Sequence, residues 1–384
     1  MVNILSVTGQ DKRVIDRVLL LLAIKPQDKL VDFSHIYEKV NRDCGASKEE
    51  ILKALRELMD QGFIERVGDK YRITEDGRQE AWKLAYDPKM NLSYRLVFLA
   101  RYYYPRIADL ILPFLRDRPV TVVKVFSDDN DPIRSIKPIF SRYAKLKPRK
   151  YNFINSRDEL LKYVNAHAID FIPYVHRLGN DYPDWLIIDI DAGDSIKEAG
   201  EVGFQLIKEI TWETCVVIQE DLGMHPCVKF SGSRGFQIWL KPEKPLGSFE
   251  DYRRAVEIIR DLVEEKLKGR YDELRSDYGD IFEIPITTTT VAKKELRRRR
   301  ILLDWSSLKP EGDVRAPFSM HYRTGLVSVP ISLNDIKRFS PKLARVEEVI
   351  KRKEEIAKAF ELKPSPTDIL ARKMGKGGLL EFII

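Results

Sequence analysis

The sequence has 384 residues, 43% of them hydrophobic and 33% charged, which is typical of a globular protein that buries a sizeable core. Its formal net charge of +7 and its isoelectric point of about 9.0 favour an acidic partner, of which nucleic acid is the commonest. No stretch reaches the roughly 20 apolar residues that a membrane helix needs, and the first residues lack the pattern of a secretory signal. We therefore expect a soluble, cytoplasmic protein with no membrane partner.

Three scattered cysteines, Cys44, Cys215 and Cys227, are too few for a disulfide framework. No CxxC or CxxH pair of the kind that binds zinc is present. We therefore expect no structural zinc ion.

Residues 1–86 predict three helices followed by a hairpin. Apolar spacing marks helices over 14–22 and 33–40, and a capping sequence at Ser47 introduces a third over 49–60. Two short strands around Gly68 and Asp69 complete the order of a winged helix, a variant of helix-turn-helix.

Two interpretations of this N-terminal module stay open. The third helix, with Lys70 and Arg72 on the hairpin, would bind duplex DNA. However, four acids on that helix weigh against reading DNA and favour a protein-docking module: Glu49, Glu50, Glu57 and Asp60.

Helical and strand patterns alternate without a repeat from about residue 92, after a linker at Asp87 and Pro88, which indicates a mixed α+β domain. A basic, aromatic-bearing stretch covers 134–151. It is either a solvated loop and helix or a nucleic-acid contact through Lys137, Arg142 and Lys145, because cations interleaved with aromatic rings hold phosphates and stack bases.

An apolar strand ending in Asp189 and Asp191 carries the first chemical signal. Residues two apart in a strand project from one face, so the two carboxylates lie together. Two negative charges held so close together are costly unless a cation compensates them. The pair is therefore a candidate site for one or two hard divalent ions.

A loop rich in small residues, 231–235, joins two further apolar strands. Its glycines let the backbone approach an anion, while Ser231, Ser233 and Arg234 supply hydroxyl and guanidinium donors for phosphate. The alternative is an ordinary hairpin turn, because turns use the same residues.

The third motif is another apolar strand, which begins directly after four arginines that include Arg300 and ends at Asp304. A carboxylate from a separate strand is what a two-ion site needs to complete its ligands. The following loop, 315–325, is dense in donors suited to a triphosphate and contains Arg315, Ser319, His321 and Arg323.

Together and in this order, the three motifs resemble those of the archaeo-eukaryotic primase superfamily. The likeness is greatest to the polymerase domain of bacterial end-joining DNA ligases, through the segments 102–103, 118–121, 169–174, 303–305 and 316–319. The third motif, Ser319-x-His321-x-Arg323-Thr324-Gly325, is more similar to the catalytic subunit of archaeal and eukaryotic primases. The resemblance covers roughly residues 100–332.

The resemblance implies that Asp189, Asp191 and Asp304 are catalytic and hold two Mg²⁺ or Mn²⁺ ions. It also implies a nucleoside triphosphate site, to which we assign Ser231, Ser233, Arg234, Gln237, Arg300, Arg315, Ser319, His321 and Arg323.

The sequence departs from the family at two positions. Gln237 replaces the histidine that closes the second motif, and Ile172 replaces a histidine that end-joining polymerases usually place before Pro173. Glutamine donates a hydrogen bond but carries no positive charge, so nucleotide binding is expected to be altered.

We therefore expect an α+β primase–polymerase catalytic domain with mixed sheets and flanking helices over 87–343, behind the winged helix. Its function would be template-directed nucleotidyl transfer that extends primers or broken ends of DNA in replication or repair. The alternatives are a non-catalytic nucleic-acid-binding protein and an assembly factor of a replication complex that keep the fold.

The remaining residues, 344–384, predict a charged helix over 344–360, a short helix over 369–374, a glycine spacer and an apolar end. That end either docks on the protein's own core or binds a partner. Lys376-x-x-Leu379-x-x-Phe382-Ile383 loosely resembles the box that binds a sliding clamp, in which residues three apart face one pocket.

Overall fold

The computed structural model describes residues 9–26, 28–289 and 298–375, and the chain forms two compact units. One unit runs up to Arg106 and includes Val122–Phe140 and Asp158–Ile169. The other comprises Ile107–Thr121, Ser141–Arg157 and the chain from Asp170 onward.

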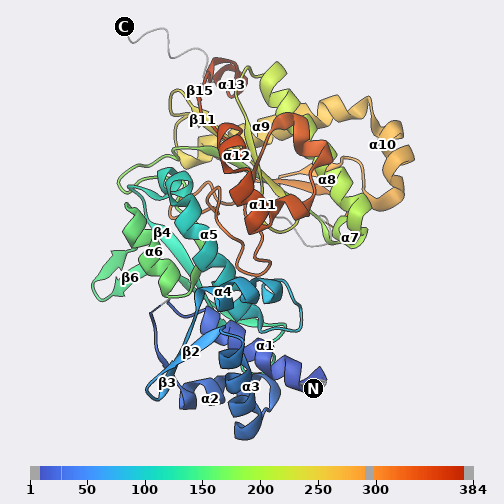
Figure 1. Ribbon diagram of the computed structural model, residues 1–384. Helices are drawn as coiled ribbons and strands as arrows, with labels where there is room; N and C mark the ends of the chain where they lie inside the picture. The colour runs from blue at the N-terminus through green and yellow to red at the C-terminus, as the bar shows by residue number, and fades with distance from the viewer. Residues whose placement is uncertain (1–8, 27, 290–297, 376–384) are drawn as a thin grey trace. The chain divides into compact units, whose positions relative to one another are not determined.

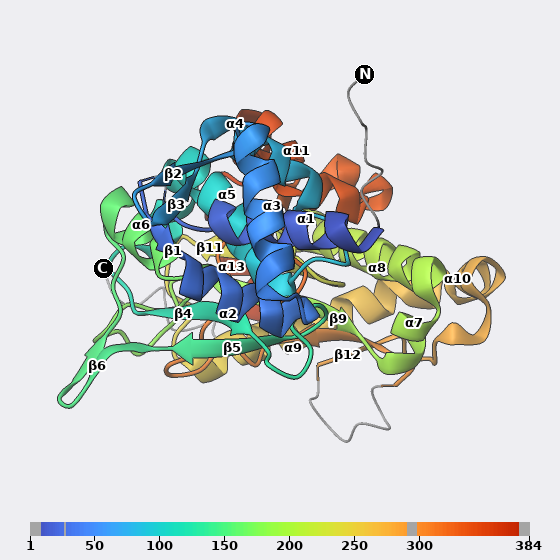
Figure 2. The ribbon, with the colours of Figure 1, turned by 60° about the horizontal axis from the view of Figure 1, so that its bottom comes forward.

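The first unit begins with the predicted helices and hairpin. These elements are α1 (Gly9–Ala23), β1 (Val31–Asp32), α2 (Phe33–Cys44), α3 (Lys48–Asp60), β2 (Ile64–Val67) and β3 (Lys70–Ile73) (Figure 1). Helix α3 packs on α1 (Figure 2), and Ser47 and Glu50 form the predicted capping box. The two-residue β1, too short to show a pattern, adds a third strand in the order β1-β3-β2. The interpretation as a winged helix stays a prediction.

The first unit continues beyond the predicted boundary at residue 86. The chain forms α4 (Glu75–Ala81), the 3-10 turn η1 (Trp82–Leu84) and α5 (Leu92–Leu115), which extends into the second unit. It then forms β4 (Val120–Ser127), β5 (Ile136–Ser141), α6 (Arg157–Asn165) and β8 (Ala168–Pro173), with a sheet in the order β5-β4-β8. The part of β8 from Asp170 onward belongs to the second unit. Within the described ranges, no helix is long and apolar enough to cross a membrane.

A mixed sheet organises the second unit. Its main path has the order β12-β13-β9-β11-β10-β14. The strands are β9 (Leu186–Ala192), β10 (Cys227–Phe230), β11 (Phe236–Pro242), β12 (Thr287–Thr288), β13 (Ile301–Asp304) and β14 (Pro330–Ile331), and β15 (Pro364–Ser365) pairs with the end of β11. The four strands predicted from the motifs are therefore neighbours, in the order β13-β9-β11-β10.

Helices cover one face of this sheet. The long helices α8 (Gly200–Glu220) and α9 (Phe249–Lys268) contact β9, β11, β12 and β13 (Figure 1). Smaller elements complete the unit: β6 (Tyr143–Leu146), β7 (Arg149–Tyr151), α7 (Asp194–Glu198), α10 (Tyr271–Tyr278), η2 (Gly279–Ile281), η3 (Leu333–Arg338), η4 (Pro341–Ala344), α11 (Val346–Lys351), α12 (Lys353–Lys358) and α13 (Asp368–Lys373).

The C-terminal predictions are confirmed in part. The short helix expected over 369–374 is α13. The single helix expected over 344–360 is wrong, because it is divided into α11 and α12 at Arg352, whose backbone leaves the helical conformation. The segment that resembles a clamp-binding box lies outside the described residues.

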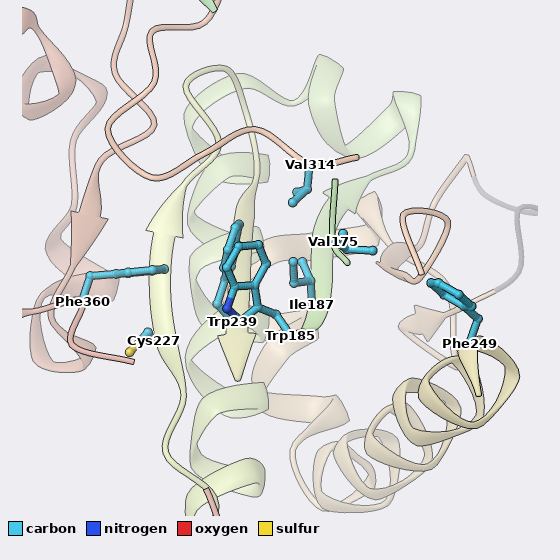
Figure 3. Close-up of a cluster of buried hydrophobic side chains, with 8 residues drawn as sticks. All are labelled: Val175, Trp185, Ile187, Cys227, Trp239, Phe249, Val314 and Phe360. Atoms are coloured by element: carbon cyan, nitrogen blue, oxygen red, sulfur yellow. The ribbon is translucent and has the colours of Figure 1, made fainter. Parts of the chain in front are cut away.

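The other face of the sheet carries an aromatic cluster at one end of its strands. Trp185 and Trp239 lie side by side with their ring centroids 4.8 Å apart (Figure 3). The cluster also contains Val175, Ile187, Cys227, Phe249, Val314 and Phe360. Side chains alternate along a strand, so Asp189, two residues after Ile187 on β9, projects from this same face. Gln237, two residues before Trp239 on β11, does so too.

Candidate active site

One polar row crosses four strands of the central sheet. Asp304 on β13 lies opposite Asp189 on β9, which lies opposite Gln237 on β11, which lies opposite Lys229 on β10. Directly opposed residues of antiparallel strands project from the same face. The strand order therefore brings together two predicted catalytic carboxylates, the residue that departs from the family motif, and a lysine.

Asp191 shares this face but is engaged elsewhere. Its Oδ2 accepts a hydrogen bond from Lys197 Nζ at 2.8 Å, and its Oδ1 accepts one from its neighbour's backbone N–H at 2.9 Å. Both carboxylate oxygens of Asp304 also have partners, the backbone N–H of Ser306 at 2.7 Å and its hydroxyl at 2.9 Å. The two outer carboxylates are thus turned toward local donors.

The electrostatics of the row are those of crowded acids beside a buried cation. Burial and the charges of Asp191 and Asp304 raise the pKa of Asp189 to about 7. Lys229 is fully buried, and burial lowers the pKa of its ammonium well below the usual value. Its Nζ donates to Ser328 Oγ at 2.6 Å, and its charge partly offsets the effect of the acids on Asp189.

The donor chemistry of this row suits hard divalent cations, which prefer carboxylate oxygens. Gln237 adds a further acceptor, because its Oε1 is buried without a hydrogen-bond partner in the described structure. Nevertheless, among the residues that the structure describes, no three acids, histidines or cysteines are grouped closely enough to hold one ion. The bonds of Asp191 to Lys197 and of Asp304 to Ser306 are consistent with this, because a shared ion would need both carboxylates to turn inward.

The glycine-containing loop joins β10 to β11, as predicted. Ser231 Oγ accepts hydrogen bonds from the backbone N–H groups of Ser233 at 3.4 Å and Gly235 at 3.2 Å, so this hydroxyl stabilises the turn. A side chain at Gly235 would meet Ile190 O at 2.3 Å, and one at Gly232 would meet His321 Cβ at 2.8 Å. Glycine is thus required where the loop packs on β9 and on the third motif.

The third motif presents a neutral histidine. His321 Nδ1 accepts from the backbone N–H groups of Arg323 at 3.2 Å and Thr324 at 3.3 Å. Burial, followed by the charge of Arg315, lowers the pKa of His321 to about 4. A neutral ring that accepts at Nδ1 carries its proton on Nε2, so His321 has one N–H left to donate.

Asp170, on β8, is the organising residue that the sequence analysis did not single out. It is fully buried and accepts from Arg315 Nε at 2.9 Å and Nη2 at 2.8 Å. It also accepts from Ser319 Oγ at 3.0 Å and from the backbone N–H of Tyr322 at 3.3 Å. Arg315 Nη1 continues to Ser231 O at 2.9 Å, so one carboxylate connects the third motif to the glycine-containing loop. The sequence signal that could have identified Asp170 is an acid inside an otherwise apolar strand.

Two cavities border the polar row and share Asp189, Gln237 and Arg315. The larger, of about 590 Å³, is also lined by Ile190, Asp191, Lys197, Ser231, Ser233, Arg234, Gly235, His321, Arg323 and Thr324. The smaller, of about 330 Å³, is also lined by Arg142, Ile172, Ser306, Ser307, Lys309, Glu311, Asp313 and Val314. Seven of the nine predicted nucleotide-binding residues therefore surround the larger cavity.

The other two predicted nucleotide-binding residues, Ser319 and Arg300, do not line either cavity. Ser319 is fully buried and bonded to Asp170, so its place is structural. The carbonyl of Arg300 accepts from Gly193 N at 2.9 Å, next to β9.

The predicted nucleic-acid contacts are distributed over both units. In the second unit, Arg142 lines the smaller cavity and pairs with Asp313 at 3.5 Å, while Lys145 is exposed on the hairpin of β6 and β7. In the first unit, Lys137 pairs with Asp129 at 2.7 Å, Arg72 pairs with Glu65, and Lys70 is exposed. Three of the five residues thus belong to the first unit and two to the second.

A carboxylate pair on adjacent strands faces a cavity lined by cations and small residues, an arrangement suited to divalent ions and a polyanion. The chain belongs to the LigD primase–polymerase domain family, whose model matches residues 99–360. The predicted relation to the archaeo-eukaryotic primase superfamily is thereby confirmed. Family membership supports a nucleotidyltransferase-type function.

Two curated relatives of the chain are DNA primase small subunits. That of Pyrobaculum arsenaticum is 26% identical over 226 residues, which are 49% of this chain and 68% of the relative. That of Pyrobaculum calidifontis is 29% identical over 178 residues, 40% of this chain and 53% of the relative. The chain thus spans between about half and two thirds of the length of these relatives.

The fold is similar to that of the polymerase domain from Mycobacterium tuberculosis Ligase D, solved in complex with DNA. The TM-score is 0.52 at 18% sequence identity, over 68% of this chain and 92% of that domain. This likeness shows the fold, and it confirms the predicted α+β architecture of the catalytic domain.

Proposed function

We propose that the second unit catalyses template-directed nucleotidyl transfer, extending the 3′ end of a primer or of broken DNA with nucleoside triphosphates. The observation that carries the proposal is the register of Asp304 with Asp189 at the edge of a cavity that Arg234, Arg315 and Arg323 make cationic. The acids would position cations, and the arginines beside them would bind a polyanion. This arrangement suits in-line attack on a triphosphate.

The cationic side of the larger cavity would hold the triphosphate. Arg234 and Arg323 are exposed and offer forked guanidinium donors, which match phosphate oxygens. His321 would donate from Nε2, and its bonded Nδ1 keeps the ring oriented. Asp170 would keep Arg315 directed into the cavity, because two of its four bonds are to Arg315 and the other two hold the third motif in place.

The acidic side would hold two divalent ions through Asp189, Asp191 and Asp304, a role to which Mg²⁺ and Mn²⁺ are suited. When bound, such ions lower the pKa of the primer 3′-hydroxyl and neutralise the charge of the triphosphate. For this to happen, Asp191 would exchange Lys197 for an ion. Lys197, once released, lies in the same cavity and can pair with a phosphate.

The hairpin of β6 and β7 would contact the nucleic acid. Its residues include Lys145, Lys147, Arg149 and Lys150, all exposed, and Leu146 at its tip is 72% exposed. Cations with an exposed apolar tip suit a strand whose bases are unstacked. In the first unit, the exposed Lys70 on β3 would contact duplex DNA, as part of the proposed winged helix.

Primer extension with a labelled template–primer tests the proposal. With Mn²⁺ and either ribo- or deoxyribonucleotides, we expect incorporation that the double substitution Asp189→Ala/Asp191→Ala abolishes. Asp221→Ala, which removes an acid from the end of α8, is the matched control and should retain activity. Absence of extension over a wide range of metals and substrates would refute the proposal.

A non-catalytic nucleic-acid-binding platform is the second candidate function. The ion pair of Asp191 with Lys197 and the neutral Gln237 favour it, because both reduce the charge that ions and triphosphate would meet. Template–primer binding that is retained in Asp189→Ala/Asp191→Ala and does not respond to divalent ions would support this second candidate.

A further inference from the structure

A cationic and aromatic cavity lies in the first unit, apart from the residues discussed so far. Its volume is about 600 Å³, within the range of sites that hold one small ligand. Its lining combines Lys25, Arg78, Arg101 and Arg106 with Trp82, Phe98 and Tyr102, and also includes Ala23, Pro26, Glu75, Gln79 and Asn165. It is formed by the end of α1 and by α4, η1 and α5, with one residue of α6.

Two of the arginines cap helix α1. Arg78 donates to Ala23 O and to Lys25 O, both at 2.9 Å. Arg101 donates to Ile24 O and, at 2.8 Å, to Asn165 O. These bonds account for the positions of the two guanidiniums, because the last carbonyls of a helix need donors.

The charge exceeds what capping requires. A helix C-terminus carries roughly half a negative charge, whereas four cations and a single acid, Glu75, line the cavity. None of the four cations forms an ion pair with a carboxylate in the part of the chain that the structure describes. In the described structure the Lys25 Nζ atom donates to a histidine, His35 Nε2, at 3.1 Å. Arg106 lies over the Tyr102 ring at 3.7 Å and donates to Tyr102 O at 2.7 Å.

Crowding of these cations has an electrostatic cost. Burial and the neighbouring Arg78 lower the pKa of Arg101 to about 10, and burial and Arg101 lower the pKa of Lys25. An anion among them would relieve this repulsion, as a cation does for paired carboxylates.

The aromatic side of the cavity is centred on Trp82. Its ring is partly buried and meets Phe98 and Tyr102 edge-on, at centroid distances of 5.2 and 4.4 Å. Proteins that bind single-stranded nucleic acids combine an aromatic ring with several phosphate-binding cations, because every base has a face that can stack on the ring. A base inside a cavity must be unpaired, so duplex DNA does not fit.

We propose that this cavity binds one nucleotide of a single-stranded nucleic acid, with its phosphate on Lys25, Arg78 and Arg101 and its base against Trp82. The site would hold an unpaired strand at a place distinct from the catalytic cavities. It shares with the proposed function only that the ligand is nucleic acid.

Lys25→Gln and Lys83→Gln are the matched pair that tests the phosphate contact. Neither lysine caps α1, and each substitution removes one charge, but Lys83 is exposed and pairs with Glu80. We expect Lys25→Gln in the full chain to weaken binding of a fluorescent oligo-dT about threefold to tenfold and to reduce the salt slope by about 0.7, the value for one phosphate contact on a single strand. Lys83→Gln should change neither. Equal effects of the two substitutions would overturn the proposal.

Photocrosslinking tests the base contact directly. An oligonucleotide containing 5-iododeoxyuridine should crosslink to the tryptic peptides 79–83 or 102–106, which contain Trp82 and Tyr102. Trp82→Leu should remove the first crosslink and weaken binding. Crosslinks confined to the second unit, or a Lys25→Gln effect without any Trp82→Leu effect, would overturn the nucleotide assignment. Neither measurement requires catalysis, so each result is independent of primer extension.

Discussion

Two rows of residues lie on the same face of the same three strands, two positions apart, and differ in almost every property. Asp189, Gln237 and Lys229 form one row across β9, β11 and β10. Ile187, Trp239 and Cys227 form the other. The first row borders two cavities, whereas the second belongs to the buried aromatic cluster (Figure 3).

The comparison shows that burial alone does not separate structure from function. Lys229 and Trp239 are both fully buried, and Gln237 is 4% exposed. What differs is charge: the polar row carries the Asp189 carboxylate, which lies near those of Asp191 and Asp304, and the Lys229 ammonium, whereas the aromatic row carries no charged group. Each row has one buried atom without a hydrogen-bond partner among the described residues, Gln237 Oε1 and Trp239 Nε1. We expect substitutions in the polar row to affect activity first, and those in the aromatic row to affect stability first.

The largest effect is expected at Asp304. Asp304→Asn should reduce primer extension about a thousandfold, since a metal-binding carboxylate is worth several kcal/mol. The melting temperature should stay the same or rise slightly, because a like charge is removed from Asp189. Asp194→Asn, at an exposed acid in the first turn of α7, is the control. A large fall in melting temperature would assign Asp304 to structure instead.

Trp239→Ala should show the opposite behaviour. Removal of this fully buried indole is expected to lower the free energy of unfolding by about 3–5 kcal/mol, measured by denaturant titration. Activity per folded molecule should persist at low temperature. Trp212→Ala, where the ring is only partly buried beneath Lys337, should cost less. Lost activity without lost stability would contradict the division between the rows.

Asp170→Asn should combine both effects. Removing one partner of a buried ion pair costs about 3 kcal/mol, and Arg315 would lose the charge that holds it. We expect lower stability together with a raised KM for the triphosphate and a less affected kcat. The control is Asp313→Asn, because Asp313 forms a looser ion pair with Arg142, at 3.5 Å. A change in stability with an unchanged KM would make Asp170 purely structural.

Gln237→His tests the departure from the family motif. If glutamine only weakens the site, restoring histidine should lower the apparent KM for the triphosphate about fivefold, because a charge-assisted hydrogen bond replaces a neutral one. Steady-state kinetics on a fixed template–primer measure this. An unchanged or higher KM would mean that the cavity is built around glutamine.

The smallest effect concerns acid stability. The pKa of His321 is lowered to about 4 in the folded chain, so below pH 6.5 the unfolded chain takes up a proton that the folded chain does not. Its contribution to stability is therefore complete above pH 6.5 and is lost as the pH falls toward 4. We expect His321→Gln to flatten the decline in unfolding free energy over this range by about 1 kcal/mol. Identical pH profiles would contradict this.

Much of the site was predictable because its signals are local. An alternating strand places Asp189 and Asp191 on one face whatever surrounds it, and a turn of small residues between two strands must be a loop. Asp170 was not singled out, because its four hydrogen bonds join residues about 150 positions away. Ser319 was assigned to the nucleotide for the same reason, since only packing shows that its hydroxyl faces inward.

The sequence by itself determined the elements, the loop chemistry and the family, because hydrophobic period, turn residues and ordered motifs are properties of short segments. Only the tertiary structure decided which residues meet. Strand order put Asp304 beside Asp189 and Gln237 beside Lys229, and helix packing gathered four cations around Trp82. Neighbours such as Asp304 and Asp189, or Lys25 and Trp82, are separated by tens to more than a hundred residues, and their contacts depend on how the whole chain buries its apolar surface.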